Sequence, residues 1–170
     1  MLRRVVVVLS ALVLLLPAVF VSGPAQASGT HVYAGKRITI SLKRERLRAW
    51  VGQRVVWVSP ITSGNASLPT PVGRFTIFAK RSPYTFVSPW PKGSANWYPP
   101  SKVSFAMEFR GGGYFIHDAP WRGVYGPGSN QGSQAGTNYG GTHGCVNVPY
   151  NTARFLYYWA PMGTPVHIVP

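Results

Sequence analysis

Short apolar runs with a period of two recur along the chain, and they constrain its fold more than any other feature. In residues 37–42, Ile38, Ile40 and Leu42 alternate with polar residues and therefore share one face of an extended strand. Similar alternating or continuous apolar runs occupy residues 47–51, 55–58, 75–79, 103–109, 114–117 and 165–169. Many short strands predict an all-β sandwich or barrel, because each strand must bury an apolar face against another layer.

Glycine and proline mark the turns and loops between these strands. Gly52 with Gln53 predicts a turn between two strands, and the three glycines at residues 111–113 predict another. Residues 82–100 and 123–141 are rich in glycine and proline, and we expect long loops there. The sequence contains no internal repeat and no linker, so we expect one globular domain.

One helix is expected near the C-terminal end. Asn147 is of a residue type that caps helix N-termini, and Pro149 is favoured in a first turn. The apolar face of this helix is expected to comprise Ala153, Leu156, Tyr157 and Ala160. The sequence therefore predicts a β-sandwich with one short helix that begins just after Cys145.

The first 27 residues have the pattern of a secretory signal peptide. Two arginines form a basic start, residues 5–21 are apolar, and residues 25–27 supply small side chains for cleavage. We therefore expect residues 1–27 to be removed and residues 28–170 to form one secreted domain, extracellular or in the cell wall. Without cleavage the apolar run, close to the ~18 residues that span a bilayer, would be a membrane anchor.

The chain is strongly basic, with 17 Lys and Arg, three acidic residues and a net charge of +14. Removal of the predicted signal, which holds two arginines and no acid, leaves a net charge of +12.

With only Glu45, Glu108 and Asp118 as acids, mechanisms that need paired carboxylates or carboxylate-rich metal sites are poorly supported. No nucleic-acid-binding motif is present, so no nucleic-acid partner is expected. The charge favours attraction to an anionic extracellular polymer or membrane surface, or serves solubility alone.

Cys145 is the single cysteine, which excludes an intrachain disulfide. It lies in the segment Thr-His-Gly-Cys-Val-Asn at residues 142–147. We expect the following helix and a nearby imidazolium to lower the pKa of this thiol. His117, at the end of a strand, is the candidate general base, and backbone N–H groups around Gly144 are candidates to bind an oxyanion. The segment thus predicts a cysteine nucleophile, whereas a structural cysteine would be a small buried hydrophobe.

Four segments of the chain, taken in order, carry a family resemblance. His117 precedes residues 142–147 in the pattern His, loop, Ser/Thr-His-Gly-Cys-hydrophobic-Asn/Arg. The other three segments are residues 70–77, which begin Thr-Pro-Val-Gly, residues 116–122 and residues 163–166. In these features the chain resembles the YkuD type of L,D-transpeptidase catalytic domain, over roughly residues 38–169.

The resemblance implies a β-sandwich enzyme that remodels peptidoglycan stem peptides without a cofactor or metal. A thiolate attacks the carbonyl before the terminal D-alanine of a tetrapeptide stem, and a side-chain amine of a second stem resolves the thioester into a 3-3 cross-link. Cys145 would be the nucleophile and His117 the general acid/base, oriented by the backbone carbonyl of Asp118. His143 and Gly144 would shape the oxyanion site. The resemblance also implies a carbapenem target, and we expect a monomer.

Substrate-binding residues around this centre are implied in the same way. Thr142 and Asn147 would line the donor site, with Asn147 either contacting the donor stem or capping the helix. Gly112 and Gly113 would form the backbone of a donor groove and Trp121 its wall. All three fit equally well as turn and core residues.

Two stretches depart from the family pattern. The loop between His117 and Thr142 is longer than usual in the family and is either a lid or an insertion. The aromatic stretch at residues 84–100 either stacks on glycan or stem, or packs locally.

Other classes fit the sequence less well. A sortase-like transpeptidase carries Thr-Leu-x-Thr-Cys, which this chain lacks, and a papain-like wall hydrolase places its cysteine before its histidine. A zinc hydrolase would have to use His117, Asp118, His143 and Cys145, whose spacing matches no known metal motif. A non-catalytic cationic wall-binding module explains the charge but not the cysteine. An L,D-carboxypeptidase, in which water resolves the thioester, is a further alternative.

Overall fold

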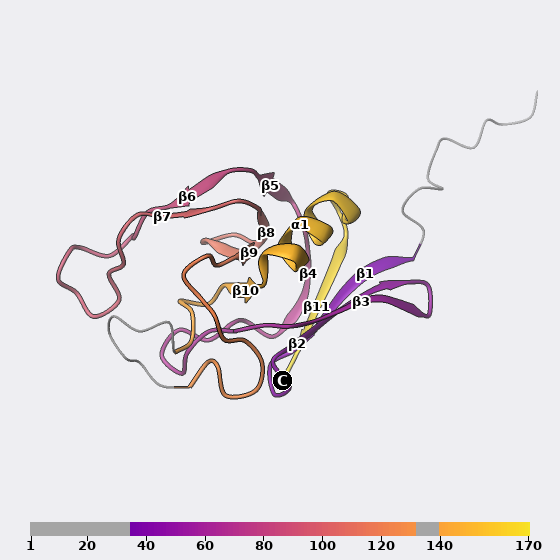
Figure 1. Cartoon of the computed structure of the whole chain (residues 1–170), viewed down its shortest axis with the longest axis horizontal. Helices are drawn as coiled ribbons and strands as arrows, with labels where there is room; N and C mark the ends of the chain where they lie inside the picture. The colour runs from indigo at the N-terminus through magenta and orange to yellow at the C-terminus, as the bar shows by residue number, and fades with distance from the viewer. Residues whose placement is uncertain (1–34, 132–139) are drawn as a thin grey trace, which may run out of the picture.

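The computed structural model describes residues 35–131 and 140–170, and Figure 1 shows their path. In chain order the elements are β1 Lys36–Ser41, β2 Arg46–Val51, β3 Arg54–Pro60, β4 Gly73–Thr76, β5 Ala79–Arg81, β6 Tyr84–Phe86, β7 Ser101–Val103, β8 Ala106–Arg110, β9 Tyr114–Asp118, β10 Val146–Val148, α1 Tyr150–Trp159 and β11 Pro165–Val169. Strands dominate the described chain, and α1 is the one α-helix in it.

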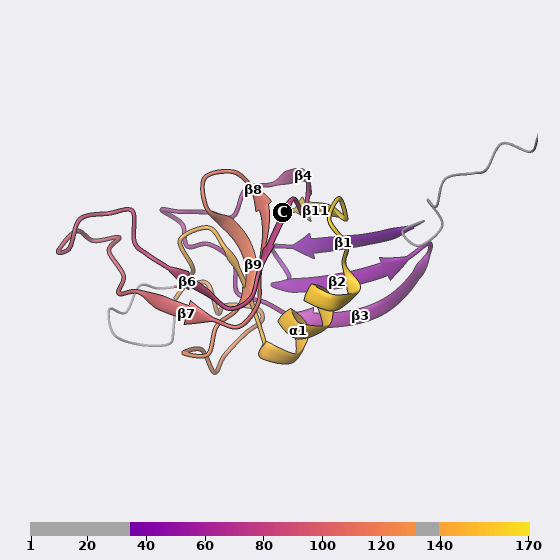
Figure 2. The same cartoon turned by 90° about the horizontal axis from the view of Figure 1, so that it is seen from above.

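The alternating apolar residues build a five-stranded sheet with the order β3-β2-β1-β11-β4. β1 pairs antiparallel with β2 and parallel with β11, and Figure 2 shows β1, β2 and β3 side by side. Ile38 lies opposite Ala49 and Ile40 opposite Leu47, and all four side chains are fully buried. The period-two pattern therefore sets the register, because a shift by one residue would turn these side chains to solvent.

A second sheet has the order β10-β9-β8-β5. β8 and β9 form an antiparallel hairpin through the glycines at residues 111–113, as predicted, and β10 pairs parallel with β9. This parallel pair sets Asn147 opposite His117. A separate two-stranded hairpin, β6 with β7, extends to the left in Figure 1.

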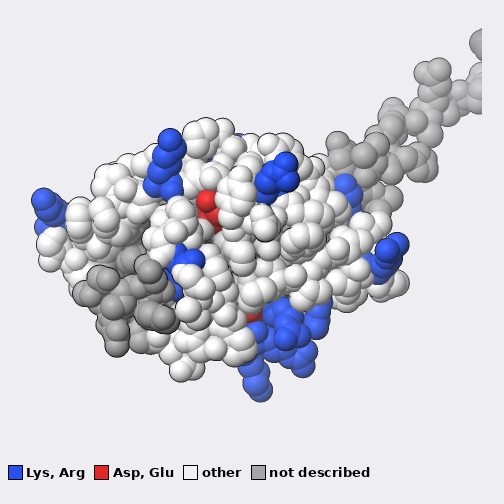
Figure 3. All heavy atoms as spheres, viewed as in Figure 1, with Lys and Arg blue, Asp and Glu red and all other residues white. Residues whose placement is uncertain are grey.

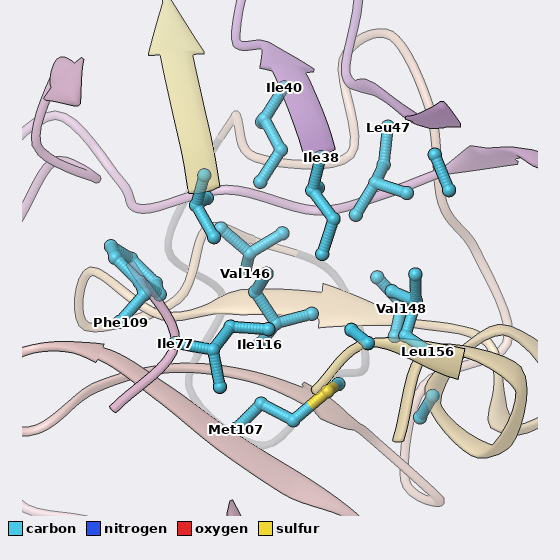
Figure 4. Close-up of a cluster of buried hydrophobic side chains, with 14 of the residues drawn as sticks. Ile38, Ile40, Leu47, Ile77, Met107, Phe109, Ile116, Val146, Val148 and Leu156 are labelled. Atoms are coloured by element: carbon cyan, nitrogen blue, oxygen red, sulfur yellow. The ribbon is translucent and has the colours of Figure 1, made fainter. Parts of the chain in front are cut away.

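Both sheets and α1 contribute to one main apolar core, seen in Figure 4. Its members include Ile38, Leu47, Ile77, Met107, Phe109, Ile116, Val146 and Leu156. Burial of each such large side chain stabilises the fold by roughly 1.5–3 kcal/mol. Trp57 of β3 also stacks on Phe155 of α1, with ring centroids 4.4 Å apart, which holds the helix against the first sheet. The predicted β-sandwich with one short helix is confirmed.

The helix begins later than the sequence predicted, because a short strand precedes it. Val146–Val148 forms β10, and Pro149 is the N-cap of α1 without any side-chain capping hydrogen bond. Asn147 therefore does not cap the helix. Its backbone N–H and C=O instead bond to the backbone of Thr62, 2.9 Å in each direction. On the predicted apolar face, Ala153, Leu156 and Ala160 are fully buried, whereas Tyr157 is only partly buried.

Two predicted strands are divided between sheets. The run at residues 75–79 ends in the first sheet at Thr76 and resumes in the second at Ala79, because Ile77 between them turns into the core. The run at residues 103–109 is likewise split between β7 and β8. The stretch at residues 82–100, expected as loop, begins with β6.

The predicted signal peptide and its cleavage point lie outside the described residues, so the boundary between residues 27 and 28 stays a prediction. Among the described helices, none has the length and apolar character needed to cross a membrane.

Candidate active site

A pocket of about 470 Å³ opens where β9 meets the segment before β10. Its lining residues are Phe86, Trp97, Tyr98, Pro99, Ser101, His117, Trp121, Arg122, Gly141, Thr142, His143, Cys145 and Asn147. The pocket brings together six of the nine residues that the sequence singled out, and it excludes Gly112, Gly113 and Gly144. A larger hollow of about 690 Å³ over α1 contains neither a thiol nor an imidazole, so the smaller pocket is the candidate active site.

Strand β9 presents His117 to this pocket. Its Nδ1 lies 2.6 Å from the backbone carbonyl oxygen of Asp118. A carbonyl can only accept, so Nδ1 carries the proton and Nε2 is left as the acceptor. The predicted contact between His117 and the Asp118 carbonyl is therefore present. Burial lowers the pKa of His117 to about 4, so the imidazole is neutral near neutral pH.

The carboxylate of Asp118 takes no part in this contact. It accepts the backbone N–H groups of Ser104 at 3.0 Å and Phe105 at 2.7 Å, just before β8. The acid therefore anchors the β8–β9 hairpin, while its backbone orients the histidine.

Cys145 is half-buried, and its thiol donates to the carbonyl oxygen of Gly113 at 3.4 Å. Burial raises the pKa of Cys145 to about 11, against the opposing hydrogen bond from the backbone of Phe115. The predicted lowering of this pKa is wrong for two physical reasons. α1 starts only at Tyr150, beyond the range of a helix dipole, and the imidazole of His117 carries no charge.

Hydroxyl groups shape the turn that carries the thiol. Thr142 Oγ1 accepts the N–H of Gly144 at 3.0 Å and donates to the carbonyl of Cys145 at 2.6 Å. Thr70 Oγ1 donates to the carbonyl of Gly144 at 3.0 Å. Gly144 has φ +104°, and a Cβ there would lie 2.6 Å from the ring of Tyr114, so this position requires glycine. The N–H of Gly144, which we expected to face the substrate, is therefore used inside the turn.

His143 lies in an aromatic setting on the pocket wall. Its ring centroid is 5.3 Å from that of Trp90 and 5.1 Å from that of Tyr98. Burial lowers the pKa of His143, while a hydrogen bond with the backbone of Asn96 opposes the shift. The aromatic stretch at residues 84–100 thus packs on the segment at residues 142–147 and also lines the pocket through Trp97 and Tyr98.

Asn147 lines the pocket from β10 and is 3% exposed. Its side-chain Oδ1 is buried and has no hydrogen-bond partner within the described residues. Because buried acceptors are normally paired, this oxygen is available to a ligand donor.

Of the remaining predicted residues, Trp121 lies in the pocket, whereas Gly112 and Gly113 do not line it. Trp121 lines the pocket with its ring centroid 6.2 Å from that of His117. Gly112 and Gly113 lie exposed in the β8–β9 turn, and of the two only Gly113 contacts the thiol. Across residues 35–131 and 140–170, no three His, Cys, Asp or Glu side chains gather in a way that could hold a metal ion.

Sequence reasoning missed two residues around the site. Phe86 of β6 lies with its ring centroid 4.6 Å from that of His117, and it was hidden because its stretch was expected as loop. Arg122 lines the pocket and donates to the carbonyl of Gly140 at 2.9 Å. The sequence did offer a signal for Arg122, because this residue ends the segment at residues 116–122 that resembles the family.

Comparison with known proteins agrees with this geometry. The family model of the YkuD L,D-transpeptidase catalytic domain matches residues 35–168. The chain therefore belongs to the YkuD family of L,D-transpeptidase catalytic domains.

The individual relatives share low sequence identity with this chain. L,D-transpeptidase 2 of Mycobacterium tuberculosis (strain CDC 1551 / Oshkosh) is 28% identical over 145 residues, 82% of this chain and 33% of the relative. The NMR structure of the catalytic domain from E. faecium L,D-transpeptidase matches with TM-score 0.62 and 26% identity, covering 79% of this chain and 96% of that one. LdtMt1, solved in complex with imipenem, shares the fold with TM-score 0.66 and 22% identity, covering 79% and 59%. The chain spans a third to less than half of the curated relatives it matches.

Proposed function

We propose that this protein is a secreted peptidoglycan L,D-transpeptidase that forms 3-3 cross-links. One observation carries the proposal: the thiol of Cys145 and the imidazole of His117, oriented by the Asp118 carbonyl, line the same pocket. A nucleophile, a base and a group that orients the base are the components of nucleophilic acyl transfer.

The reaction proceeds in two halves. The sulfur of Cys145 attacks the carbonyl before the terminal D-alanine of a tetrapeptide stem while His117 Nε2 takes the thiol proton. His117 then gives that proton to the departing amine of D-alanine, which leaves a thioester. A neutral side-chain amine of an acceptor stem attacks the thioester and gives its proton to His117. Sulfur leaves and regains the proton, so one amide bond replaces another.

The resting protonation states determine how the first proton moves. With the thiol pKa at about 11 and the imidazole pKa at about 4, a preformed thiolate–imidazolium pair is disfavoured. Proton transfer must then accompany formation of the carbon–sulfur bond. Because the N–H of Gly144 is bonded to Thr142, the N–H of Cys145 is the donor that we assign to the developing oxyanion.

Three residues are proposed to contact the donor stem. The unpaired Oδ1 of Asn147 accepts an N–H of the stem backbone, and Trp121 forms one wall of the pocket. The carbonyl of Gly113 releases the thiol as the substrate enters. The aromatic setting of His143 makes it a support for the site rather than a second base.

Attachment to the wall is proposed to be electrostatic. Lys43, Arg44 and Arg46 are exposed in and beside the turn between β1 and β2. Figure 3 shows basic side chains gathered at the lower edge of the molecule, where Figure 1 places that turn. Such a group attracts an anionic polymer outside the cell, where the predicted signal peptide would deliver the domain.

Intact-protein mass spectrometry with a disaccharide-tetrapeptide tests the chemistry. We expect a thioester adduct on Cys145 with release of D-alanine, and Cys145→Ala should form no adduct while retaining its fold, because Ala is close to Cys in size. A carbapenem should also acylate Cys145, as imipenem binds the structurally similar LdtMt1.

Different outcomes favour different alternatives. Turnover retained by Cys145→Ala would exclude the cysteine mechanism. Adducts that are resolved only by water, even with acceptor stems present, would indicate an L,D-carboxypeptidase. A sortase-like enzyme would act on another acyl donor and leave the tetrapeptide intact.

A further inference from the structure

Glu45 is an acid buried inside a basic turn. It is 2% exposed, although its neighbours Arg44 and Arg46 are exposed. It is also the one non-glycine residue of the described chain with positive φ, 42°. L residues seldom adopt this conformation, and here it accompanies a side chain that is directed into the protein.

The carboxylate of Glu45 holds Ser63. Oε2 accepts the backbone N–H of Ser63 at 2.7 Å, and Oε1 accepts its hydroxyl. The backbone carbonyl of Glu45 accepts the N–H of Ile61 at 2.9 Å, and Asn130 Nδ2 donates to Ser63 Oγ at 3.1 Å. Residues 61–63 are therefore tied to the β1–β2 turn by both backbone and side chain.

Ser63 in turn holds the segment that carries the nucleophile. Its carbonyl accepts the N–H of Thr142 at 2.9 Å, and the N–H of Asn65 donates to the carbonyl of Thr142 at 3.0 Å. Thr142 Oγ1 then bonds both the N–H of Gly144 and the carbonyl of Cys145. An unbroken series of hydrogen bonds thus runs from Glu45 through Ser63 and Thr142 to the backbone of Cys145.

We propose that Glu45 is a positioning residue for the nucleophile: by holding Ser63, its carboxylate sets the backbone of residues 142–145 so that an N–H faces the oxyanion. This inference rests on the proposed acyl transfer at Cys145. Glu45 does not line the pocket and touches no substrate. Burial raises the pKa of Glu45, while the two bonds from Ser63 and the charge of Arg122 oppose that shift.

A purely structural anchor and a positioning residue predict different chemistry. Acylation of Cys145 by a carbapenem develops an oxyanion and therefore needs the backbone donor in place. Alkylation of the same thiol by iodoacetamide displaces iodide and forms no oxyanion. Loss of positioning should slow the first reaction and leave the second unchanged.

The test measures both rates by intact mass at pH 9 on the folded full chain. Glu45→Ala should slow acylation on the order of tenfold or more, because small misplacement of a catalytic group is costly. Glu45→Gln retains the shape and one acceptor and should fall between Glu45→Ala and wild type. Thr152→Val is the matched control: Thr152 is also buried and bonds Trp57 and Ser59, but it is outside the series. It should lower thermal stability without slowing acylation.

A double variant completes the test. If Glu45 acts through Ser63, Glu45→Ala with Ser63→Ala should acylate no more slowly than Glu45→Ala alone. Equal acylation rates in wild type and Glu45→Ala would overturn the inference, as would parallel losses in acylation and alkylation. If wild type itself is not acylated while its thiol is alkylated, the proposed function fails and the inference fails with it.

Discussion

At the level of single residues, burial moves the pKa values of His117 and Cys145 in opposite directions. His117 is held near 4 and Cys145 near 11, so both are neutral over a wide range of pH. The cause is desolvation in each case, which disfavours the charged form of either group. In the proposed reaction, these neutral groups leave the proton to move while charge develops on the substrate.

These shifts predict a pH dependence of stability. Below pH 6.5 the imidazole of His117 is protonated in the unfolded chain but stays neutral in the native state, because burial lowers its native pKa to about 4. The free energy of unfolding therefore decreases as pH drops from 6.5 toward 4, by roughly 3 kcal/mol in all. Above pH 9 the unfolded chain loses the Cys145 proton that the native state retains, so stability falls again toward pH 11.

Denaturant unfolding of paired variants isolates each contribution. Relative to wild type, His117→Gln should gain stability as pH falls from 6.5 to 4, and Cys145→Ala should gain as pH rises from 9 to 11. Differences that do not change with pH would mean that neither group is desolvated as described.

The two histidines of the pocket should differ in their effect on the rate. If His117 transfers the proton, His117→Ala should slow D-alanine release by the ~10²–10⁴-fold typical of general acid–base catalysis. His143→Ala should cost less, because the ring packs between Trp90 and Tyr98 and supports the segment. Steady-state rates at one pH decide the order, and the reverse ranking would make His143 the base.

At the level of elements, the β6–β7 hairpin covers His117 through Phe86. Phe86 of β6 packs on His117 and on Phe115 of β9, with ring centroids 4.6 and 5.1 Å away. A hairpin distant in sequence thus provides the apolar cover over the base.

Truncation of that cover should change the titration of the base. In Phe86→Ala, water reaches the imidazole, the penalty on its charged form falls, and the pKa of His117 should rise toward 6.5. Phe86→Leu retains an apolar cover and should keep the pKa low. NMR titration of the His117 ring measures both, and an unchanged pKa in Phe86→Ala would assign the desolvation to other neighbours.

At the level of the whole molecule, the basic surface predicts wall binding that depends on salt. Exposed charges are screened over ~10 Å at 0.1 M salt and ~3 Å at 1 M. Cys145→Ala protein should therefore co-sediment with cell-wall sacculi at low salt and be released near 1 M. Neutralisation of the exposed Arg44 and Arg46 together with the half-buried Arg48 of β2 should weaken binding and leave turnover of soluble stems unchanged.

Salt-independent sedimentation would contradict the electrostatic proposal and make specific contacts, such as Trp90 and Trp97, the next residues to test. Absence of sedimentation at any salt would leave the charge to solubility alone.

The sequence by itself determined most strands of the sandwich and singled out Cys145 as the candidate nucleophile. Ile38, Ile40 and Leu47 alternate because one face of each strand is buried, and that information is local. The segment at residues 142–147 with His117 pointed to the family in the same way, because residue types and order suffice to recognise a motif. The contact of His117 with the Asp118 carbonyl joins neighbours in the chain and was also predictable.

Only the tertiary structure decided the protonation states and the path of the backbone around the thiol. Val146–Val148 is a strand because β9, some thirty residues earlier, offers an edge to pair with, and this pairing moves α1 away from Cys145. The thiol is neutral rather than ionised because desolvation depends on neighbours from distant segments. The contact between Glu45 and Ser63 likewise depends on the tertiary structure. A buried carboxylate needs hydrogen-bond donors, and here the fold supplies them from a segment 18 residues away in the sequence.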